Sequence, residues 1–316
     1  MIDMKVLFTY DYGQEKMDRI RQLGYELIYV HENEVLMDAV TEDADILVCY
    51  NPFSRLDLRR MKQLKLIQLS SVGIDQVPLE YIQGRNIILS NNRGGYSIPM
   101  GEWIVMKILE MLKHSKELYA QQQKKQWEID TGLLELYGKT VGFIGTGTIA
   151  HEAAKRLQGF GVTIVGVNTT GRNSGYFQRC YPMKALDEAL GKCDVVVLAI
   201  PYTENTHHLI NKKRIEAMQR GVYFVNVSRG SIVDQEALVE ALQDGKIQAA
   251  ALDVFEEEPL PLGNLLWSLD NAIITPHNSW ISEMRNERRF RTIYENLSRF
   301  QKGELLINVV DLKKGY

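Results

Sequence analysis

The sequence predicts an α/β protein with two doubly wound parallel sheets, and two observations carry this prediction. Short, nearly continuous apolar runs alternate with amphipathic stretches along the 316-residue chain, and such runs are typical of parallel strands that helices cover on both faces. A glycine-rich loop stands at mid-chain, between one of these runs and a stretch with helical spacing. Because the chain is long enough for about two domains, we expect one sheet before this loop and a second sheet that begins with it.

The first series of expected strands has no phosphate-binding glycine motif. The turn after its first strand, residues 10–14, contains a single glycine, Gly13. The expected strands are Lys5–Thr9, Glu26–Val30, Asp45–Tyr50, Lys65–Ser70 and Asn86–Ser90. We therefore expect this domain to lack a phosphate-bearing cofactor.

One long helix is expected to follow, from Pro99 to about Tyr119. Proline suits the first turn of a helix, and Trp103, Met106 and Leu109 recur near one face. The polar run at residues 121–126 breaks this pattern. We expect an exposed arm there.

The second series of expected strands is complete enough for a Rossmann fold. Its six members are Thr140–Ile144, Val162–Val167, Asp194–Ile200, Val222–Val227, Gln248–Val254 and Asn271–Thr275. An amphipathic helix marked by Phe290, Ile293, Leu297 and Phe300 and an apolar segment, Leu305–Val310, come after them.

The glycine loop carries the sequence G-x-G-x-x-A, with Gly145, Gly147 and Ala150 in the motif positions. A strand, this motif and a helix are the arrangement in which backbone N–H groups receive a pyrophosphate. We therefore predict a dinucleotide site, with Thr148 and Ile149 at the helix start among the contacts. A glycine turn that joins a strand to a helix without binding a ligand is the alternative.

The residue that usually distinguishes the two nicotinamide dinucleotides is not acidic here. Asn168 ends the strand after the glycine loop, and Thr169, Thr170 and Arg172 follow. A carboxylate at this position would repel a ribose 2′-phosphate, whereas a guanidinium suits a phosphate. We predict NADP as the preferred cofactor. In the alternative, Arg172 is a solvated charge and Asn168 binds the ribose of NAD.

Composition gives no reason to expect a nucleic acid or a membrane as partner. The formal net charge is −3, and no apolar stretch approaches the roughly 20 residues that span a bilayer. The N-terminus lacks the layout of a signal peptide. Three cysteines without CxxC spacing suggest neither disulfides nor a zinc site. We expect a cytoplasmic protein that uses no metal.

Three groups suited to the reduction of a 2-keto acid follow successive strands of the second series. Arg229 follows the fourth strand, residues 256–258 form an acidic cluster after the fifth, and His277 follows the sixth. A guanidinium can hold a carboxylate, an imidazole can exchange the carbonyl proton, and a carboxylate can orient that imidazole. Arg229 as a helix cap or domain bridge is the alternative, and Glu256 and Glu257 are expected to be solvated.

The chain resembles the D-isomer-specific 2-hydroxyacid dehydrogenase family over almost its whole length. The resemblance is carried by residues 136–145, 201–206, 226–230, 253–259 and 275–277, in the order and spacing of that family. Residues 71–75 resemble its substrate loop. Met100-Gly101-Glu102 departs from the usual Val-Ala-Glu.

The resemblance implies a role for each matching residue. Arg229 would bind and polarise the substrate, His277 would be the general acid/base, and Glu258 would be its partner. Val72 and Gly73 would receive the substrate carboxylate on their backbone N–H groups. Three further residues would lie at the cofactor: Pro201, Thr206 and Asp253.

The resemblance also implies a domain plan and a partner. Residues 97–286 would form the cofactor domain, inserted into a substrate domain made of residues 1–96 and 287–316. The arm around Trp127 would contribute to a homodimer. The substrate would be a small 2-keto acid, of glyoxylate or hydroxypyruvate type, reduced to the D-2-hydroxy acid.

Two other functions stay open. The family includes corepressor relatives, so a non-enzymatic dinucleotide sensor is one alternative. A formate dehydrogenase on the same fold is the other, but those relatives carry glutamine where this chain has Glu258. Tyr96, Met100 and Trp280 suit either a small or an aromatic substrate side chain.

Overall fold

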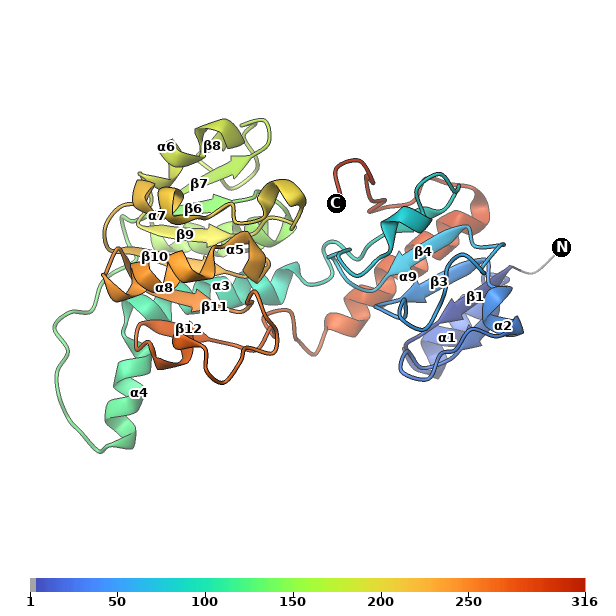
Figure 1. Ribbon diagram of the computed structural model, residues 1–316, viewed down its shortest axis with the longest axis horizontal. Coiled ribbons are helices and arrows are strands. Elements are labelled where there is room, and N and C mark those ends of the chain that lie inside the picture. Colours follow the sequence, from blue (N-terminus) through green and yellow to red (C-terminus); the bar gives the residue numbers. More distant parts are fainter. Residues whose placement is uncertain (1–3, 316) are drawn as a thin grey trace. The chain divides into compact units, whose positions relative to one another are not determined.

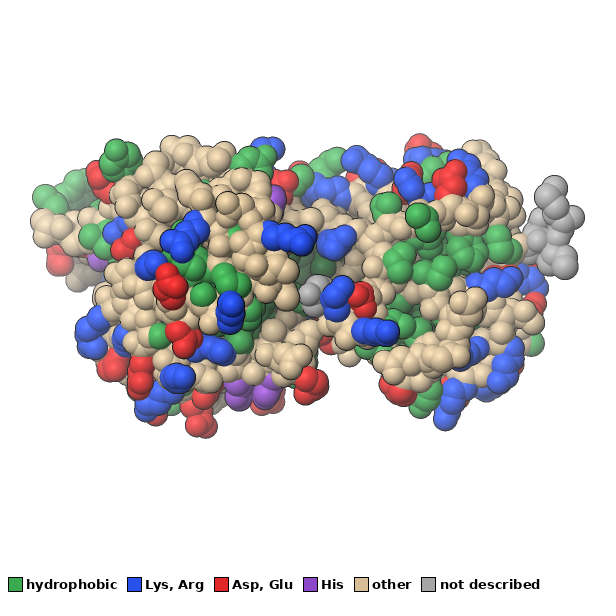
Figure 2. All heavy atoms as spheres, turned by 90° about the horizontal axis from the view of Figure 1, so that it is seen from above, with side chains coloured by type: hydrophobic (Ala, Val, Ile, Leu, Met, Phe, Trp, Pro, Cys, Tyr) green, Lys and Arg blue, Asp and Glu red, His purple; other side chains and the backbone are tan. Residues whose placement is uncertain are grey.

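The computed structural model describes residues 4–315 and divides into two compact units (Figure 1). Met1–Tyr96 and Ser282–Tyr316 make up the first unit, and Ser97–Ile281 make up the second. Each unit has its own parallel sheet. Basic and acidic side chains are interspersed on the face of each unit that Figure 2 shows, in keeping with the small net charge.

The first unit is a five-stranded parallel sheet in the order β2-β1-β3-β4-β5. Its strands are β1 (Lys5–Phe8), β2 (Glu26–Tyr29), β3 (Ile46–Cys49), β4 (Leu66–Leu69) and β5 (Ile88–Ser90). All five expected strands are thus confirmed. The order reverses at β1, which pairs with both β2 and β3, so the sheet is doubly wound.

Alternating side chains of β1 feed two separate cores in the first unit. Val6 and Phe8 pack with α1 (Gln14–Arg21) and α9 (Arg285–Lys302), whereas Leu7 belongs to the core on the other face. The expected C-terminal helix is therefore confirmed as α9. The smaller helical elements here are α2 (Ala39–Glu42) and η1 (Leu79–Tyr81). Residues 305–310 form no strand, and only Val309 bridges to Ser90.

The second unit is a seven-stranded parallel sheet in the order β12-β11-β10-β9-β6-β7-β8. Its strands are β6 (Thr140–Ile144), β7 (Thr163–Asn168), β8 (Arg179–Pro182), β9 (Val195–Leu198), β10 (Val222–Asn226), β11 (Ile247–Leu252) and β12 (Ala272–Ile274). The order reverses between β6 and β9, the switch point at which ligands bind in such folds. The predicted fold class is confirmed, and β8 is the strand that the sequence reading missed.

Helices cover both faces of this sheet (Figure 1). On one side lie α6 (Leu186–Leu190), α7 (Lys212–Ala217) and α8 (Gln235–Gln243), and on the other lie α3 (Ser97–Leu112) and α5 (Thr148–Leu157). The short elements η2 (Gln158–Phe160), η3 (Met183–Ala185), η4 (Glu204–Thr206), η5 (Gly230–Ile232) and η6 (Leu265–Ser268) lie in the connections. Gly101 explains the departure in the Met100-Gly101-Glu102 segment, because a Cβ there would lie 2.8 Å from Glu152 Cβ on α5.

The prediction of one continuous helix over residues 99–119 is wrong. α3 ends at Leu112 and α4 (Ser115–Gln123) begins after His114, whose φ of +46° lies in the left-handed region. His114 Nδ1 lies 2.7 Å from Asp130 Oδ2. This pair connects the break between the helices to the segment that follows α4.

Candidate active site

The glycine loop connects β6 to α5 in a conformation that requires glycine. Gly145 has a φ of +99°, and a Cβ there would lie 2.3 Å from the carbonyl oxygen of Ala199. At Gly147, in contrast, no atom of the described residues lies within 4 Å of the Cβ position. Gly147 and Thr148 are exposed, and Ala150 is buried against the sheet. The start of α5 is thus open to a ligand on its backbone N–H groups.

The turn after β7 is held by one side chain, that of Asn168. Its amide nitrogen donates to Thr146 Oγ1 at 3.2 Å and to the carbonyl of Arg172 at 2.9 Å, and its amide oxygen accepts from the Gly171 N–H at 2.7 Å. Thr169 and Arg172 are exposed. Within residues 4–315 the Arg172 guanidinium has no hydrogen bond or ion pair. Asn168 therefore joins this turn to the glycine loop and leaves Arg172 available to an anion.

The turn after β9 is shaped by Thr206. Its hydroxyl donates to the carbonyl of Pro201 at 3.0 Å and accepts from the Thr203 N–H at 2.7 Å. Pro201 itself is exposed. Thr206 thus fixes the backbone of the turn at the carboxyl end of β9, beside the switch point.

The turn after β10 presents Arg229 and is tightly packed. Asn226 donates to the carbonyl of Arg229 at 3.1 Å and accepts from the Ser228 N–H at 3.0 Å. A Cβ at Gly230 would lie 1.8 Å from the carbonyl carbon of Phe255. The backbones of the loops after β10 and β11 therefore touch, which places Arg229 beside the loop that carries Glu258.

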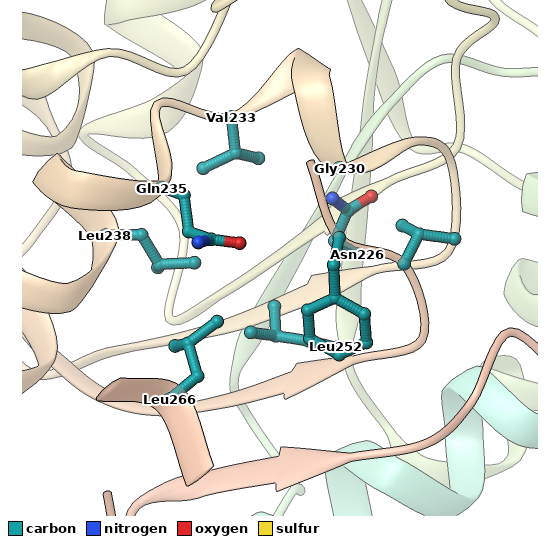
Figure 3. A pocket seen from close by; sticks show the side chains of 9 residues that line it. Asn226, Gly230, Val233, Gln235, Leu238, Leu252 and Leu266 are labelled. Atoms are coloured by element: carbon teal, nitrogen blue, oxygen red, sulfur yellow. The ribbon is translucent and has the colours of Figure 1, made fainter. Parts of the chain in front are cut away.

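A small pocket lies beneath this contact (Figure 3). Asn226, Gly230, Leu238, Leu252 and Leu266 are among the residues that line it. Its volume of about 10 Å³ has room for about one water molecule. The pocket is a packing feature that supports the turn, because a cofactor is far larger.

His277 and Glu258 form the central pair of the site. The Nδ1 atom of His277 lies 2.8 Å from Glu258 Oε2, and Glu258 Oε1 accepts a hydrogen bond from the Phe255 N–H at 3.0 Å. Both side chains are part-exposed. With Nδ1 occupied, Nε2 is the ring nitrogen of His277 that can exchange a proton with a ligand.

The charge of Glu258 is set by its neighbours. Burial of its carboxyl acts to raise its pKa. The hydrogen bonds from His277 and from the Phe255 N–H, together with the positive charge of Arg229, outweigh burial and hold this pKa below its ordinary value. Glu258 is therefore ionised near neutral pH, and a carboxylate in this position stabilises a protonated imidazole.

Asp253 holds the loop that carries His277. Its fully buried carboxylate accepts hydrogen bonds from Thr275 Oγ1 at 2.6 Å and from the N–H groups of Asn278 and Ser279 at 3.0 Å each. The resemblance implied only a place near the cofactor for Asp253. This positioning role was missed, and its signal would have been an acidic residue directly after an apolar strand.

Two more contacts link the loops at this end of the sheet. The indole of Trp280 donates to the carbonyl of His277 at 2.7 Å, which fixes the backbone of the acid/base candidate. His208 Nε2 lies 2.8 Å from Glu256 Oε1. Glu256 is exposed, as expected, and this contact joins the loop after β11 to the loop after β9.

The loop after β4, in the first unit, exposes backbone donors. Ser71 Oγ donates to the carbonyl of Gly73 at 2.9 Å, and Asn91 Nδ2 donates to the carbonyl of Val72 at 2.9 Å. Within residues 4–315, neither the Val72 N–H nor the Gly73 N–H donates a hydrogen bond. Such a pair of free N–H groups is suited to a carboxylate.

In the second unit, the structure brings Arg229, Glu258 and His277 together, as expected from the strand ends. The predicted cofactor residues lie in the loops at the same end of that sheet, after β6, β7, β9 and β11. Among residues 4–315 there is no group of three or more His, Cys, Asp or Glu side chains that could hold a metal ion. No helix in this part of the chain is long and apolar enough to cross a membrane.

Comparisons with known proteins agree with this geometry. Residues 105–279 match the model of the D-isomer specific 2-hydroxyacid dehydrogenase NAD binding domain. A glyoxylate reductase from Thermofilum pendens is 34% identical over 86% of this chain and 83% of its own. A D-3-phosphoglycerate dehydrogenase from Methanocaldococcus jannaschii is 31% identical over 98% of this chain, which spans only 60% of that relative's length.

A solved structure resembles the whole chain. It is a D-isomer specific 2-hydroxyacid dehydrogenase from Xanthobacter autotrophicus in complex with NADPH, with a TM-score of 0.83 and 27% identity over 99% of this chain and all of its own. Family model, relatives and structure agree. The chain therefore belongs to the D-isomer-specific 2-hydroxyacid dehydrogenases, a family of NAD(P)-dependent oxidoreductases.

Proposed function

We propose that this protein reduces a small 2-keto acid, of glyoxylate or hydroxypyruvate type, to the D-2-hydroxy acid and catalyses the reverse reaction. The observation that carries the proposal is the 2.8 Å contact between His277 and an ionised Glu258, beside Arg229. The relatives named glyoxylate reductase, one of them 34% identical, support this class of substrate.

The residues at the glycine loop fit a nicotinamide dinucleotide. Gly147 leaves space for a pyrophosphate beside the start of α5, where Thr148 is exposed and Ile149 is half-buried. We assign Asn168, Thr169 and Arg172 to the adenine ribose, with NADP preferred because the Arg172 guanidinium is unpaired. Pro201, Thr206 and Asp253 would lie toward the nicotinamide. When bound, the reduced cofactor supplies a hydride to the keto carbon.

The protein's own groups would bind the charged substrate and transfer the proton. Arg229 would bind and polarise the keto acid, and the N–H groups of Val72 and Gly73 would receive its carboxylate. Protonated His277 would give the Nε2 proton to the carbonyl oxygen as that oxygen gains negative charge. Glu258 would stabilise the imidazolium beforehand. In the reverse direction, neutral His277 would accept the hydroxyl proton.

The test is a set of initial rates with NADPH and NADH, each against glyoxylate, hydroxypyruvate, pyruvate and phenylpyruvate. Turnover that consumes NADPH faster than NADH is expected. Turnover with NADH alone would keep the reaction and contradict the assignment of Arg172. Binding of NADPH without turnover of any keto acid would contradict the proposal and favour a non-enzymatic sensor.

We further propose that the protein is a homodimer formed through α3, α4 and the segment that follows α4. Trp127 is 95% exposed and Ile129 is 87% exposed. A groove of about 540 Å³ runs along α3 and α4 and is lined by Met106, Leu109 and Tyr119 among others. Sedimentation of the wild-type protein and of Trp127→Ser tests this proposal: a dimer that the substitution weakens is expected, and a wild-type monomer would contradict it.

A further inference from the structure

Arg289, on the buried side of α9, has a guanidinium that the proposed reaction does not use. The residue is 8% exposed, and its Nε donates to the carbonyl of Ser70 at 3.2 Å. Within residues 4–315, its two terminal amino groups have no hydrogen-bond partner and no carboxylate lies within ion-pair distance. A buried charge without a counterion is costly, so this arrangement needs an explanation.

The neighbours of Arg289 are neutral side chains. Its guanidinium carbon lies 5.5 Å from the ring centre of Tyr10 and 5.8 Å from that of Tyr96. Burial raises the pKa of Tyr96 to about 12 and raises that of Tyr12 as well, so neither becomes a phenolate that could neutralise the arginine. The hydroxyls of Ser70 and Tyr12 are buried without a hydrogen-bond partner.

The position of this cluster connects it to substrate binding. The Ser70 carbonyl that Arg289 contacts directly precedes residues 71–75, whose Val72 and Gly73 N–H groups are free. Arg285, one helical turn before Arg289, also lies close enough to Tyr96 for its positive charge to act on that hydroxyl. Two cationic side chains of α9 therefore lie on the side of the first unit where the proposed carboxylate receptor begins.

We propose that the terminal amino groups of Arg289 form a subsite for a second anionic group of the substrate, so that the preferred substrates are 2-keto acids with a carboxylate or phosphate at the far end. This inference rests on the proposed function and narrows its substrate class. The planar guanidinium binds either oxyanion through paired hydrogen bonds. A ligand of this kind supplies the missing counterion.

The direct test compares kcat/KM for pyruvate with that for oxaloacetate, 2-oxoglutarate and 3-phosphohydroxypyruvate, using the full chain and the better cofactor. We expect at least one dianion to exceed pyruvate by about 10- to 100-fold, the range of a charge-assisted pair. Oxaloacetate and 2-oxoglutarate identify a carboxylate site, and 3-phosphohydroxypyruvate identifies a phosphate site. A wild-type protein that favours pyruvate over all three would overturn the proposal without contradicting keto-acid reduction.

Matched variants attribute the preference to Arg289. Arg289→Gln should lower the dianion-to-pyruvate ratio by about 10- to 100-fold, and Arg289→Lys should keep part of it. Arg291→Gln removes the same charge from an exposed position of α9 and should leave the ratio unchanged. A ratio that Arg289→Gln does not change would make Arg289 a structural link between α9 and β4, and would overturn the proposal.

A binding measurement keeps the subsite testable if no keto acid is reduced. Malonate and inorganic phosphate should each be tested for a rise in the melting temperature of the full chain. We expect one of them to raise it in the wild type and in Arg291→Gln but not in Arg289→Gln. Equal rises in all three proteins would contradict the subsite, whereas absent turnover would contradict only the proposed reaction.

Discussion

The two units differ in whether the polar groups near their candidate sites have hydrogen-bond partners within the chain. In the second unit, Asp253 accepts three hydrogen bonds and both oxygens of Glu258 are occupied by the chain itself. In the first unit, the N–H groups of Val72 and Gly73 and the terminal amino groups of Arg289 have no partner within residues 4–315. Satisfied networks fix a geometry, whereas donors without a partner in the chain are left to bind an acceptor from outside it.

This difference matches two requirements of the proposed reaction, which are proton transfer and binding of the anionic substrate. In the proposed reaction, the second unit would hold the His277–Glu258 pair in one arrangement before any ligand arrives, and this would avoid reorganisation during proton transfer. The first unit would offer donors whose hydrogen bonds an anionic substrate completes. We therefore expect substitutions in the second unit to change turnover, and substitutions in the first unit to change which anion is bound.

The largest expected effect is that of His277→Gln. Loss of a general acid lowers turnover by about 100-fold or more when proton transfer matters, and kcat for the best keto acid is the measurement. NADPH affinity should change little, because the ring nitrogen concerned serves the substrate. His31→Gln, at an exposed position of the first unit, is the control. A variant with normal kcat would remove His277 from the acid/base role.

Asp253→Asn tests whether the satisfied network of the second unit positions His277. An amide has one acceptor oxygen and can accept only some of the hydrogen bonds that the carboxylate accepts. We therefore expect a loss of about 1–3 kcal/mol in the free energy of unfolding. A shift of His277 should lower kcat by about 10- to 100-fold. Urea denaturation and kcat are both measured, with exposed Asp270→Asn as the control. Lower stability with unchanged kcat would show that Asp253 supports the fold alone.

The parts of this comparison that depend on local pattern were predictable from the sequence. Glycine spacing predicted the turn between β6 and α5 that we assign to the cofactor, and apolar runs located the strand ends that carry Arg229, Glu258 and His277. β8 was missed because its short edge segment, residues 179–182, includes an arginine and a proline. The break at His114 was missed because a left-handed residue without glycine leaves no clear signal.

Contacts between distant loops were beyond a reading of the sequence. The hydrogen bonds of Asp253 reach residues 275–279, and that of Trp280 fixes His277 through its backbone. The sequence does contain a signal for Arg289, because this charged residue lies one helical turn before Ile293 on the apolar side of α9. A charge in that position is a signal, but only the structure shows that no carboxylate accompanies it.

A smaller effect is expected from Glu258→Gln, measured as pH dependence. The Glu258 pKa lies below its ordinary value in the folded state, so its stabilising contribution is present above the ordinary glutamate range and disappears as pH falls through the folded-state pKa. The glutamine variant should lack this acid-dependent loss of stability. Its kcat for keto-acid reduction should also fall, since an amide stabilises a protonated imidazole less well than a carboxylate does. Identical pH profiles would contradict the coupling of Glu258 to His277.

The smallest expected effect comes from Arg172→Ala, which extends the comparison to an exposed donor of the second unit. The guanidinium has no partner within the described residues, so it resembles the donors of the first unit more than the network around Asp253. Because the site is exposed and solvent weakens the charge, we expect the NADPH/NADH ratio of kcat/KM to fall by about 3- to 10-fold. Lys155→Ala, an exposed cation of α5, controls for general charge. An unchanged ratio would show that Arg172 does not select for a 2′-phosphate. The turn held by Asn168 would then be a structural feature, and NAD would be the favoured assignment.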